Sequence, residues 1–236
     1  MTPLIRSMVS RTVRAGVDPT QMHWFDATGG ITNQTDVSLD PLLTTRPPFE
    51  KCMVCWEGHA ASNGKRMEFH LLITGRHPEE GILLGAWRMP ENGPLVGSPT
   101  MVYLVEDGLV EYGPLAENDA MDEKEGEMIM GFLSAWLGSL SRRAESYIPS
   151  VKPTFTNRRK IAAGKPPLYE WRTVVIEPVQ ARREHQGGTH ASPRLHDRRG
   201  HLRRLRSGKN VWVRECKVGN ASKGVVFHDY QIKEMA

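Results

Sequence analysis

KRMEFHLLITGRHPEEGILLGAWRMP, residues 65–90, consists of two apolar runs joined by the turn-forming segment GRHPEE. Apolar runs of this length, bounded by Gly, Pro and Asn clusters, are typical of β-strands. Similar runs occur on both sides, KCMVCWE before it and PTMVYLVEDGLVEYG after it. The Asp-Gly pair in VEDGLVEY is a strong signal for a tight hairpin. Residues 49–113 therefore predict an antiparallel meander.

The following segment, residues 122–147, predicts one long helix. Acidic residues fill its first turn, and Arg142 and Arg143 lie near its end, which the helix dipole favours. Apolar residues recur there at three- and four-residue spacing, namely Met128, Phe132, Leu133, Trp136, Leu137 and Leu140. We expect this apolar face to pack on the meander and form the main core. The predicted fold class is α+β, an antiparallel sheet with one main packing helix, followed by a basic β-rich C-terminal module.

The chain divides into three parts by composition and pattern. Residues 1–48 predict an irregular N-terminal segment with short helical pieces, one of them capped by Asp18 with Pro19 in its first position. Residues 49–150 predict an acidic α+β body. Residues 151–236 predict the basic module, with an exposed linker at about 179–193, where apolar residues are lacking and a Gly-Gly pair occurs.

The net charge of +4 hides a strong asymmetry between the two ends of the chain. Residues 1–150 carry 12 Lys and Arg against 20 Asp and Glu, whereas residues 151–236 carry 19 against 7. A basic C-terminal third of this kind is typical of nucleic-acid binding. Opposite charges could equally hold the two parts of the chain together, and charge alone leaves both readings open.

Residues 194–215, RLHDRRGHLRRLRSGKNVWVRE, concentrate this charge: eight Arg or Lys stand against two acids. If residues 202–206 are extended, cations lie on both faces of the strand and need anionic partners. Arginine suits phosphate because its planar fork forms paired hydrogen bonds. We expect contacts with the phosphate backbone of DNA or RNA from Arg194, Arg198, Arg199, Arg203, Arg204, Arg206, Lys209 and Arg214. A second expected patch comprises Arg158, Arg159, Lys160 and Lys165.

Two histidines in this stretch raise an alternative hypothesis of catalysis. His196 and His201, with Arg203 and Lys209, could supply the base, acid and cation that metal-independent RNA cleavage requires. Gly200 would allow close approach of the backbone to a ligand. A third hypothesis is an inhibitor that occupies the surface of a host protein. The purely structural interpretation is that the cations form a solvated face or pair within the molecule. In this interpretation Trp171, Tyr169 and Trp212 anchor the module.

The segment PRLHDRRGHLRRLRSGKNVWVRECKVG, residues 193–219, resembles the C-terminal module of a group of phage and mobile-element proteins. These end in His-Asp-x-Arg-Gly-His-x-Arg followed by Ser-Gly-Lys-x-x-Trp-Val-Arg. The upstream NRRKIAAGKPPLYEW, residues 157–171, is also similar to that group. The matching residues are His196, Asp197, Arg199, Gly200, His201, Arg203, Ser207, Gly208, Lys209, Trp212, Val213 and Arg214. The resemblance implies a phage or mobile-element origin. A fainter one, to small metal-independent RNase toxins, implies cleavage by His, Arg and Lys.

The remaining signals argue against several other classes of protein. Cys52 and Cys55 form a C-x-x-C pair, but no second pair completes a zinc site, and a strand would point them to opposite faces. We therefore expect buried structural cysteines and no metal. No phosphate-binding loop or dinucleotide fingerprint occurs, so no cofactor is expected. Without a secretory signal or a long apolar run, a cytoplasmic protein that does not enter a membrane is the expectation.

Overall fold

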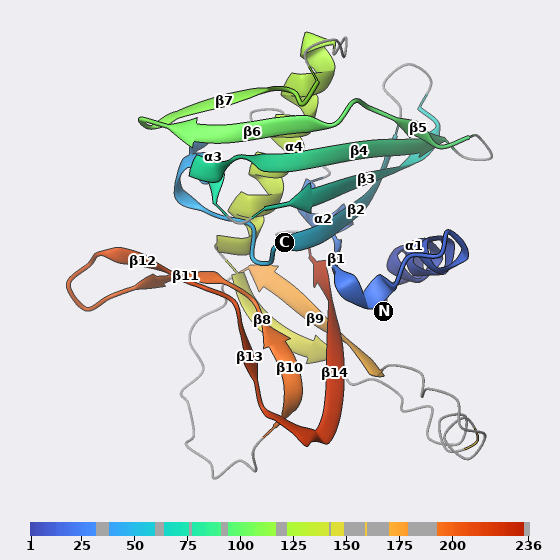
Figure 1. The fold of residues 1–236 in the computed structure, drawn as a ribbon, viewed down its shortest axis with the longest axis vertical. Helices are drawn as coiled ribbons and strands as arrows, with labels where there is room; N and C mark the ends of the chain where they lie inside the picture. Colours follow the sequence, from blue (N-terminus) through green and yellow to red (C-terminus); the bar gives the residue numbers. More distant parts are fainter. Residues whose placement is uncertain are drawn as a thin grey trace.

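The computed structural model describes residues 1–31, 38–59, 64–75, 77–90, 94–116, 122–141, 143–148, 159, 170–178 and 193–233 (Figure 1). They form a mixed α+β fold, as the sequence predicts. The helices are α1 (Pro3–Arg14), α2 (Thr28–Ile31), α3 (Asp40–Thr44) and α4 (Glu123–Ser141), with short 3₁₀ turns η1 (Pro19–Gln21) and η2 (Pro78–Glu80).

Among these residues, twelve strands join in one sheet, whose main order is β13-β10-β14-β1-β2-β3-β4-β6-β7. Strand β5 pairs with β4, β8 pairs with β9, and β9 pairs with β14. The strands are β1 (His23–Asp26), β2 (Lys51–His59), β3 (Arg66–Thr74), β4 (Ile82–Pro90), β5 (Val96–Gly97), β6 (Met101–Glu106), β7 (Leu109–Pro114), β8 (Arg143–Ile148), β9 (Glu170–Pro178), β10 (Arg194–Arg198), β13 (Cys216–Val218) and β14 (Asn220–Ile232).

The predicted meander is confirmed. Strands β2, β3, β4, β6 and β7 pair antiparallel in this order, and β2 and β3 are paired from Lys51↔Thr74 to His59↔Arg66. The Asp-Gly hairpin joins β6 to β7, where Asp107 and Gly108 have φ of 50° and 78°. Two consecutive positive φ angles are what the tight two-residue turn requires, which is why this dipeptide predicts it.

Helix α4 packs on one face of the meander, and its predicted apolar face is confirmed in part (Figure 1). Leu133, Trp136, Leu137 and Leu140 are buried in the main core, whereas Phe132 is half-buried and Met128 is 38% exposed. The helix predicted over 122–147 is longer than the observed helix α4, which ends at Ser141. Residues 143–148 instead form β8, which pairs antiparallel with β9. The run RAESYI contains Tyr and Ile, residues that favour strands, and β9 supplies its backbone partners.

The N-terminal segment is more regular than the sequence predicts. Thr2 caps α1 by accepting from the Ile5 N–H, and Leu4 and Ile5 pack with Trp24 in a second core on the other face of the sheet. Asp18 does cap a helical turn, but the turn is only η1, because β1 begins at His23. Strand β1 then lies between β14 and β2, parallel to both.

The described strands of the predicted C-terminal module also join the main sheet, so a separate module is not confirmed. Strand β14 pairs in parallel with β1, β9 and β10, which makes the sheet mixed rather than wholly antiparallel. Only β11 (His201–Arg204) and β12 (Asn210–Val213) form a sheet of their own. Most of the predicted linker, residues 179–192, lies outside the described residues. The proposed domain boundaries stay predictions.

Candidate functional site: a basic arm and the cleft at its root

Residues 201–214 form a two-stranded ribbon that projects from the body, here called the basic arm (Figure 1). Strands β11 and β12 pair antiparallel from His201↔Val213 to Arg204↔Asn210. At the tip, the Leu205 N–H donates to the Lys209 carbonyl at 2.8 Å, and the Gly208 N–H donates to the Leu205 carbonyl at 3.0 Å. Gly208 has a φ of 83°, which suits glycine at this turn.

The arm carries five Arg and Lys and no Asp or Glu. All five are exposed, and no acidic group among the described residues forms an ion pair with any of them: Arg203, Arg204, Arg206, Lys209 and Arg214. The sequence places cations on both faces of this strand. A two-stranded ribbon that stands away from the sheet exposes both faces to solvent, so these cations stay hydrated without an internal partner.

The root of the arm is fixed by Gly200. Its N–H donates to the Pro48 carbonyl at 2.9 Å, and a Cβ at this position would lie 2.8 Å from Cζ2 of Trp212 and 3.3 Å from the Pro48 oxygen. The sequence suggests that the missing side chain of Gly200 allows a ligand to approach the backbone. In the structure the Trp212 ring occupies this position instead. Trp212 is half-buried here and anchors the arm to the body.

Replacement of Gly200 by alanine is expected to lower the free energy of unfolding by about 1–3 kcal/mol, the usual cost of overpacking. The physical reason is that the added methyl group meets an indole ring and a backbone oxygen. Urea unfolding measures the change. Gly113→Ala is the control, since a Cβ at Gly113 meets no atom within 4 Å. Equal stability of the two variants would contradict the packing role of Gly200.

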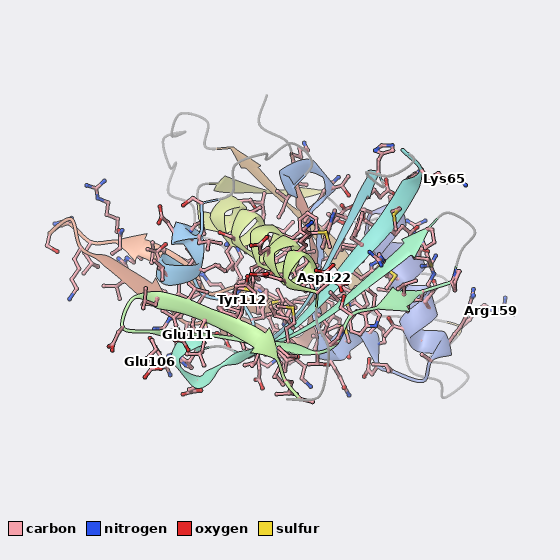
Figure 2. The ribbon with its side chains drawn as sticks, turned by 90° about the horizontal axis from the view of Figure 1, so that it is seen from above. Lys65, Glu106, Glu111, Tyr112, Asp122 and Arg159 are labelled. Carbon is pink, nitrogen blue, oxygen red and sulfur yellow. The ribbon has the colours of Figure 1, made fainter. Side chains whose placement is uncertain are left out.

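The other predicted cations are spread over several surfaces. Arg194 and Arg199 are half-buried near β10, and Arg198 is exposed at its end. Of the second predicted patch, only Arg159 lies among the described residues, and Figure 2 shows it on the opposite side of the molecule from the arm. Arg158, Lys160 and Lys165 lie outside the described residues. The described part of this patch therefore does not extend the surface of the arm.

The four predicted catalytic residues are not observed to form one cluster among the described residues. His196 lies in β10, where its Nδ1 is 2.9 Å from the Arg194 carbonyl and its ring centroid is 5.3 Å from that of His228. His201 lies in the arm, with its Nδ1 3.4 Å from the Arg199 carbonyl. Arg203 is in β11 and Lys209 is in the tip turn, and among the described residues neither forms a hydrogen bond with either histidine.

Sequence analysis missed a polar cleft of about 560 Å³ at the root of the arm. Asp197 of β10 accepts from the Lys217 ammonium at 2.9 Å, and the other oxygen of Asp197 lies 3.9 Å from Nε2 of His23. These residues come from three distant segments, and nothing in the sequence indicates that they meet. The full lining is Thr20, Gln21, His23, Phe49, Glu50, Lys51, Asp197, Glu215, Cys216 and Lys217.

His23 provides an aromatic wall for this cleft. Its ring stacks on Phe49 with the centroids 3.5 Å apart and the planes at 12°, and its side chain is 23% exposed. Burial lowers the pKa of His23 to about 4, against an opposing effect of Asp197 and with further lowering by Lys217 and His228. The imidazole is therefore neutral at neutral pH and has the character of an aromatic ring rather than of a cation.

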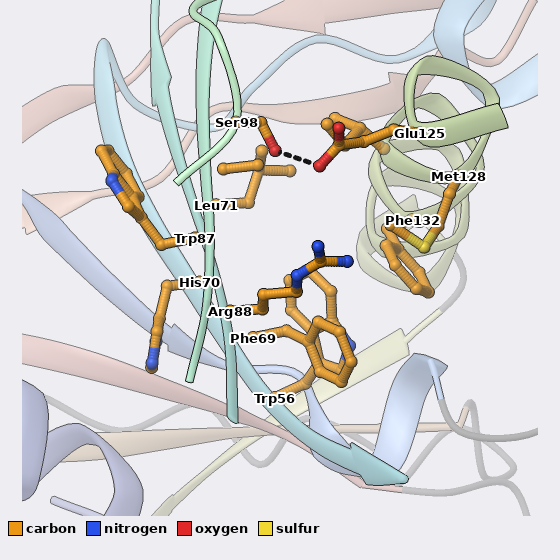
Figure 3. Close-up of a pocket in the computed structure, with 12 residues that line it drawn as sticks. Trp56, Phe69, His70, Leu71, Trp87, Arg88, Ser98, Glu125, Met128 and Phe132 are labelled. Carbon is orange, nitrogen blue, oxygen red and sulfur yellow. Dashed lines mark hydrogen bonds between the residues drawn. The ribbon is translucent and has the colours of Figure 1, made fainter. Parts of the chain in front are cut away.

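A second pocket, between the β2–β3–β4 face and α4, is too small to bind more than a water-sized molecule (Figure 3). Its free volume is about 20 Å³, close to the room that one water occupies. Trp56 stacks on Phe69 with the centroids 5.4 Å apart, and Phe132 packs against Trp56 at 4.7 Å. Ser98 donates to Glu125 at 2.6 Å across the mouth. These contacts are typical of core packing.

The predicted burial of Cys52 and Cys55 is confirmed. Cys52 and Cys55 are both buried in β2, the first in the core beneath α4 and the second in the core beneath α1. Burial raises the pKa of both thiols, which makes them unreactive. Cys216, by contrast, is exposed at the cleft. Among the described residues no group of three or more His, Cys, Asp or Glu has the geometry of a metal site.

Comparison of the chain with known protein families, with curated proteins and with solved structures found no match. No helix in the described part of the chain is long and apolar enough to cross a membrane.

Proposed function

We propose that the protein binds nucleic acid by gripping its phosphate backbone with the basic arm. The observation that carries this proposal is a projecting ribbon with five exposed cations, no acid and no ion-pair partner among the described residues. A two-stranded ribbon has the width that the major groove of B-DNA admits, and arginines on both of its faces can reach phosphates on either side. The resemblance of residues 193–219 to phage and mobile-element proteins supports placing the protein in that group.

The test is the salt dependence of binding. Each phosphate that a cation neutralises releases counterions, so the logarithm of the binding constant falls with the logarithm of salt by about 0.9 per contact on duplex DNA. Full engagement of the arm predicts a slope of up to about −4.5. Fluorescence anisotropy with a labelled duplex, from low to moderate salt, measures it. A binding constant that does not change with salt would overturn the proposal.

A charge-matched pair of variants assigns the effect to the arm. Replacement of Arg203, Arg204, Arg206 and Lys209 by glutamine is expected to weaken binding at low salt at least roughly tenfold and to flatten the slope by up to about 3.6. The control carries the same loss of charge on the body, with exposed cations of α1, β4 and α4 replaced: Arg6, Arg14, Arg88 and Lys124. Equal weakening by the two variants would show that net charge, not the arm, drives binding.

A further inference from the structure

We propose that the cleft at the root of the arm receives one unpaired base of a single-stranded nucleic acid, stacked on His23. This inference rests on the proposed function, because the arm must hold the phosphates of the same strand. It also goes beyond it, because it names single-stranded nucleic acid as the class of ligand and gives the base a defined place.

The geometry of His23 suits stacking. One face of its ring lies on Phe49 at 3.5 Å, so the ring is held in a fixed orientation, and its 23% exposed side chain lines the cleft. Proteins that bind single strands use such aromatic rings as platforms, since every base has a flat face that can stack. A cleft of about 560 Å³ lies within the range that binds small organic ligands.

The charges of the cleft select a base rather than a phosphate. Three carboxylates, from Glu50, Asp197 and Glu215, line it against two lysines, Lys51 and Lys217. A phosphate inside the cleft would be repelled by the acids, whereas an uncharged base offers them ring and amino N–H donors. One oxygen of Asp197 accepts from Lys217, and the other is 3.9 Å from His23, too far for a hydrogen bond. That second oxygen is placed to accept from a base edge.

The cleft is continuous with the arm along the chain. Strand β10 carries Asp197 and leads through Gly200 into β11, while β12 leads through Glu215 into β13, which carries Lys217. The backbone pairing of Asp197 with Lys217 keeps both side chains at this root. A strand whose phosphates lie along the arm therefore passes the mouth of the cleft, where an unpaired base can turn inward. A base within a duplex is stacked and paired, and cannot do so.

The experiment measures anisotropy of the full chain with labelled single-stranded RNA, single-stranded DNA and duplex DNA of equal length. His23→Ala is expected to weaken binding of at least one single strand by about five- to a hundredfold, the range for the loss of one base stack. The duplex affinity is expected to stay unchanged, and His23→Phe is expected to retain single-strand binding. Whether RNA, DNA or both respond identifies the sugar preference, and each of these results supports the proposal.

Equal effects of His23→Ala on single strands and duplex, or no effect on either single strand, would overturn the inference. A thermal melt checks that the variants fold. If His23→Ala does not fold, Asp197→Asn serves as the second variant, and it must change the relative affinities for the four homopolymeric single strands. The arm variant separates the two proposals: loss of the arm flattens the salt slope, whereas loss of the His23 stack leaves the slope unchanged. If the arm variant flattens the salt slope as expected but His23→Ala leaves single-strand affinity unchanged, the proposed base site in the cleft is rejected and the proposed function of the arm stands.

Discussion

Replacement of Gly219 by alanine is expected to lower the free energy of unfolding by more than about 4 kcal/mol, an exceptional loss for one methyl group. Gly219 joins β13 to β14 with a φ of 106°. An added Cβ would lie 2.2 Å from the Arg194 carbonyl oxygen and 2.7 Å from that of Pro193. Both obstacles are backbone atoms, so no change of rotamer relieves the clash, and β10 must move away from this corner.

Gly208→Ala is the matched control for this prediction. Gly208 also has a positive φ, 83°, but a Cβ there meets no atom within 4 Å. Its replacement is expected to cost only about 1–2 kcal/mol, the strain of a left-handed backbone in an L-residue. Urea unfolding with linear extrapolation gives both values. If the two substitutions cost the same, conformational strain alone explains Gly219, and the tight approach to Arg194 plays no part.

The features that could be predicted from sequence are those fixed by neighbouring residues. Apolar runs separated by turn clusters along 49–113 predict the meander, because strand pairing there is between consecutive segments. Asp107-Gly108 predicts its turn through backbone preference alone. The opposite faces of Cys52 and Cys55 follow from the two-residue period of a strand. None of these features depends on a distant part of the chain.

The features that sequence analysis missed depend on distant partners. Strand β1 has only four residues, HWFD, and its central place comes from pairing with β14, about two hundred positions later. Residues 143–148 continue an apparent helix, but β9 captures them as a strand. The same holds for the cleft, where His23 meets Asp197 and Lys217 only after the sheet has formed. Local propensity carries no information on such pairings.

The charge pattern of the arm is visible in the sequence, but the exposure of its two faces is not. Cations on both faces of a strand require anionic partners only where one face of the strand is buried. Leu202 and Trp212 pair near the root, while Arg204 and Asn210 pair beyond them, and the outer part of the ribbon is exposed. The cations therefore need no partner for folding. A ligand remains the proposed reason for their number and for the absence of acids.

Acid is expected to destabilise the protein between pH 6.5 and pH 4 through two histidines, the buried His70 and the half-buried His23. Burial is the main cause that lowers the pKa of both His70 and His23 from 6.5 to about 4. Between these values the unfolded chain binds protons that the folded chain excludes, so stability rises with pH there. The contribution of the two neutral histidines to the free energy of unfolding is complete above pH 6.5, falls as pH decreases, and is lost once pH reaches about 4. At pH 5 each histidine is expected to lower the free energy of unfolding by about 2 kcal/mol relative to its value above pH 6.5.

His70 allows this linkage to be tested apart from the cleft, because it lies in β3 and does not line the cleft. Its side chain points to the opposite face of the sheet from Phe69 (Figure 3). It is 1% exposed, and neither ring nitrogen has a hydrogen-bond partner among the described residues. Its Nε2 lies 3.7 Å from Glu68, which is already paired with Arg11 at 3.1 Å. A protonated His70 would thus face a carboxylate that Arg11 has largely neutralised, which leaves the burial cost uncompensated.

His70→Leu removes this titrating group and the unsatisfied nitrogens while keeping an apolar side chain in the core. We expect the loss of unfolding free energy between pH 6.5 and pH 5 to shrink by about half, since His23 still titrates. Urea unfolding at a series of pH values measures it, with His59→Leu, at an exposed position, as the control that should follow the wild type. A pH dependence of His70→Leu parallel to that of the wild type would show that the pKa of His70 is the same in the folded and the unfolded chain, and that burial does not lower it.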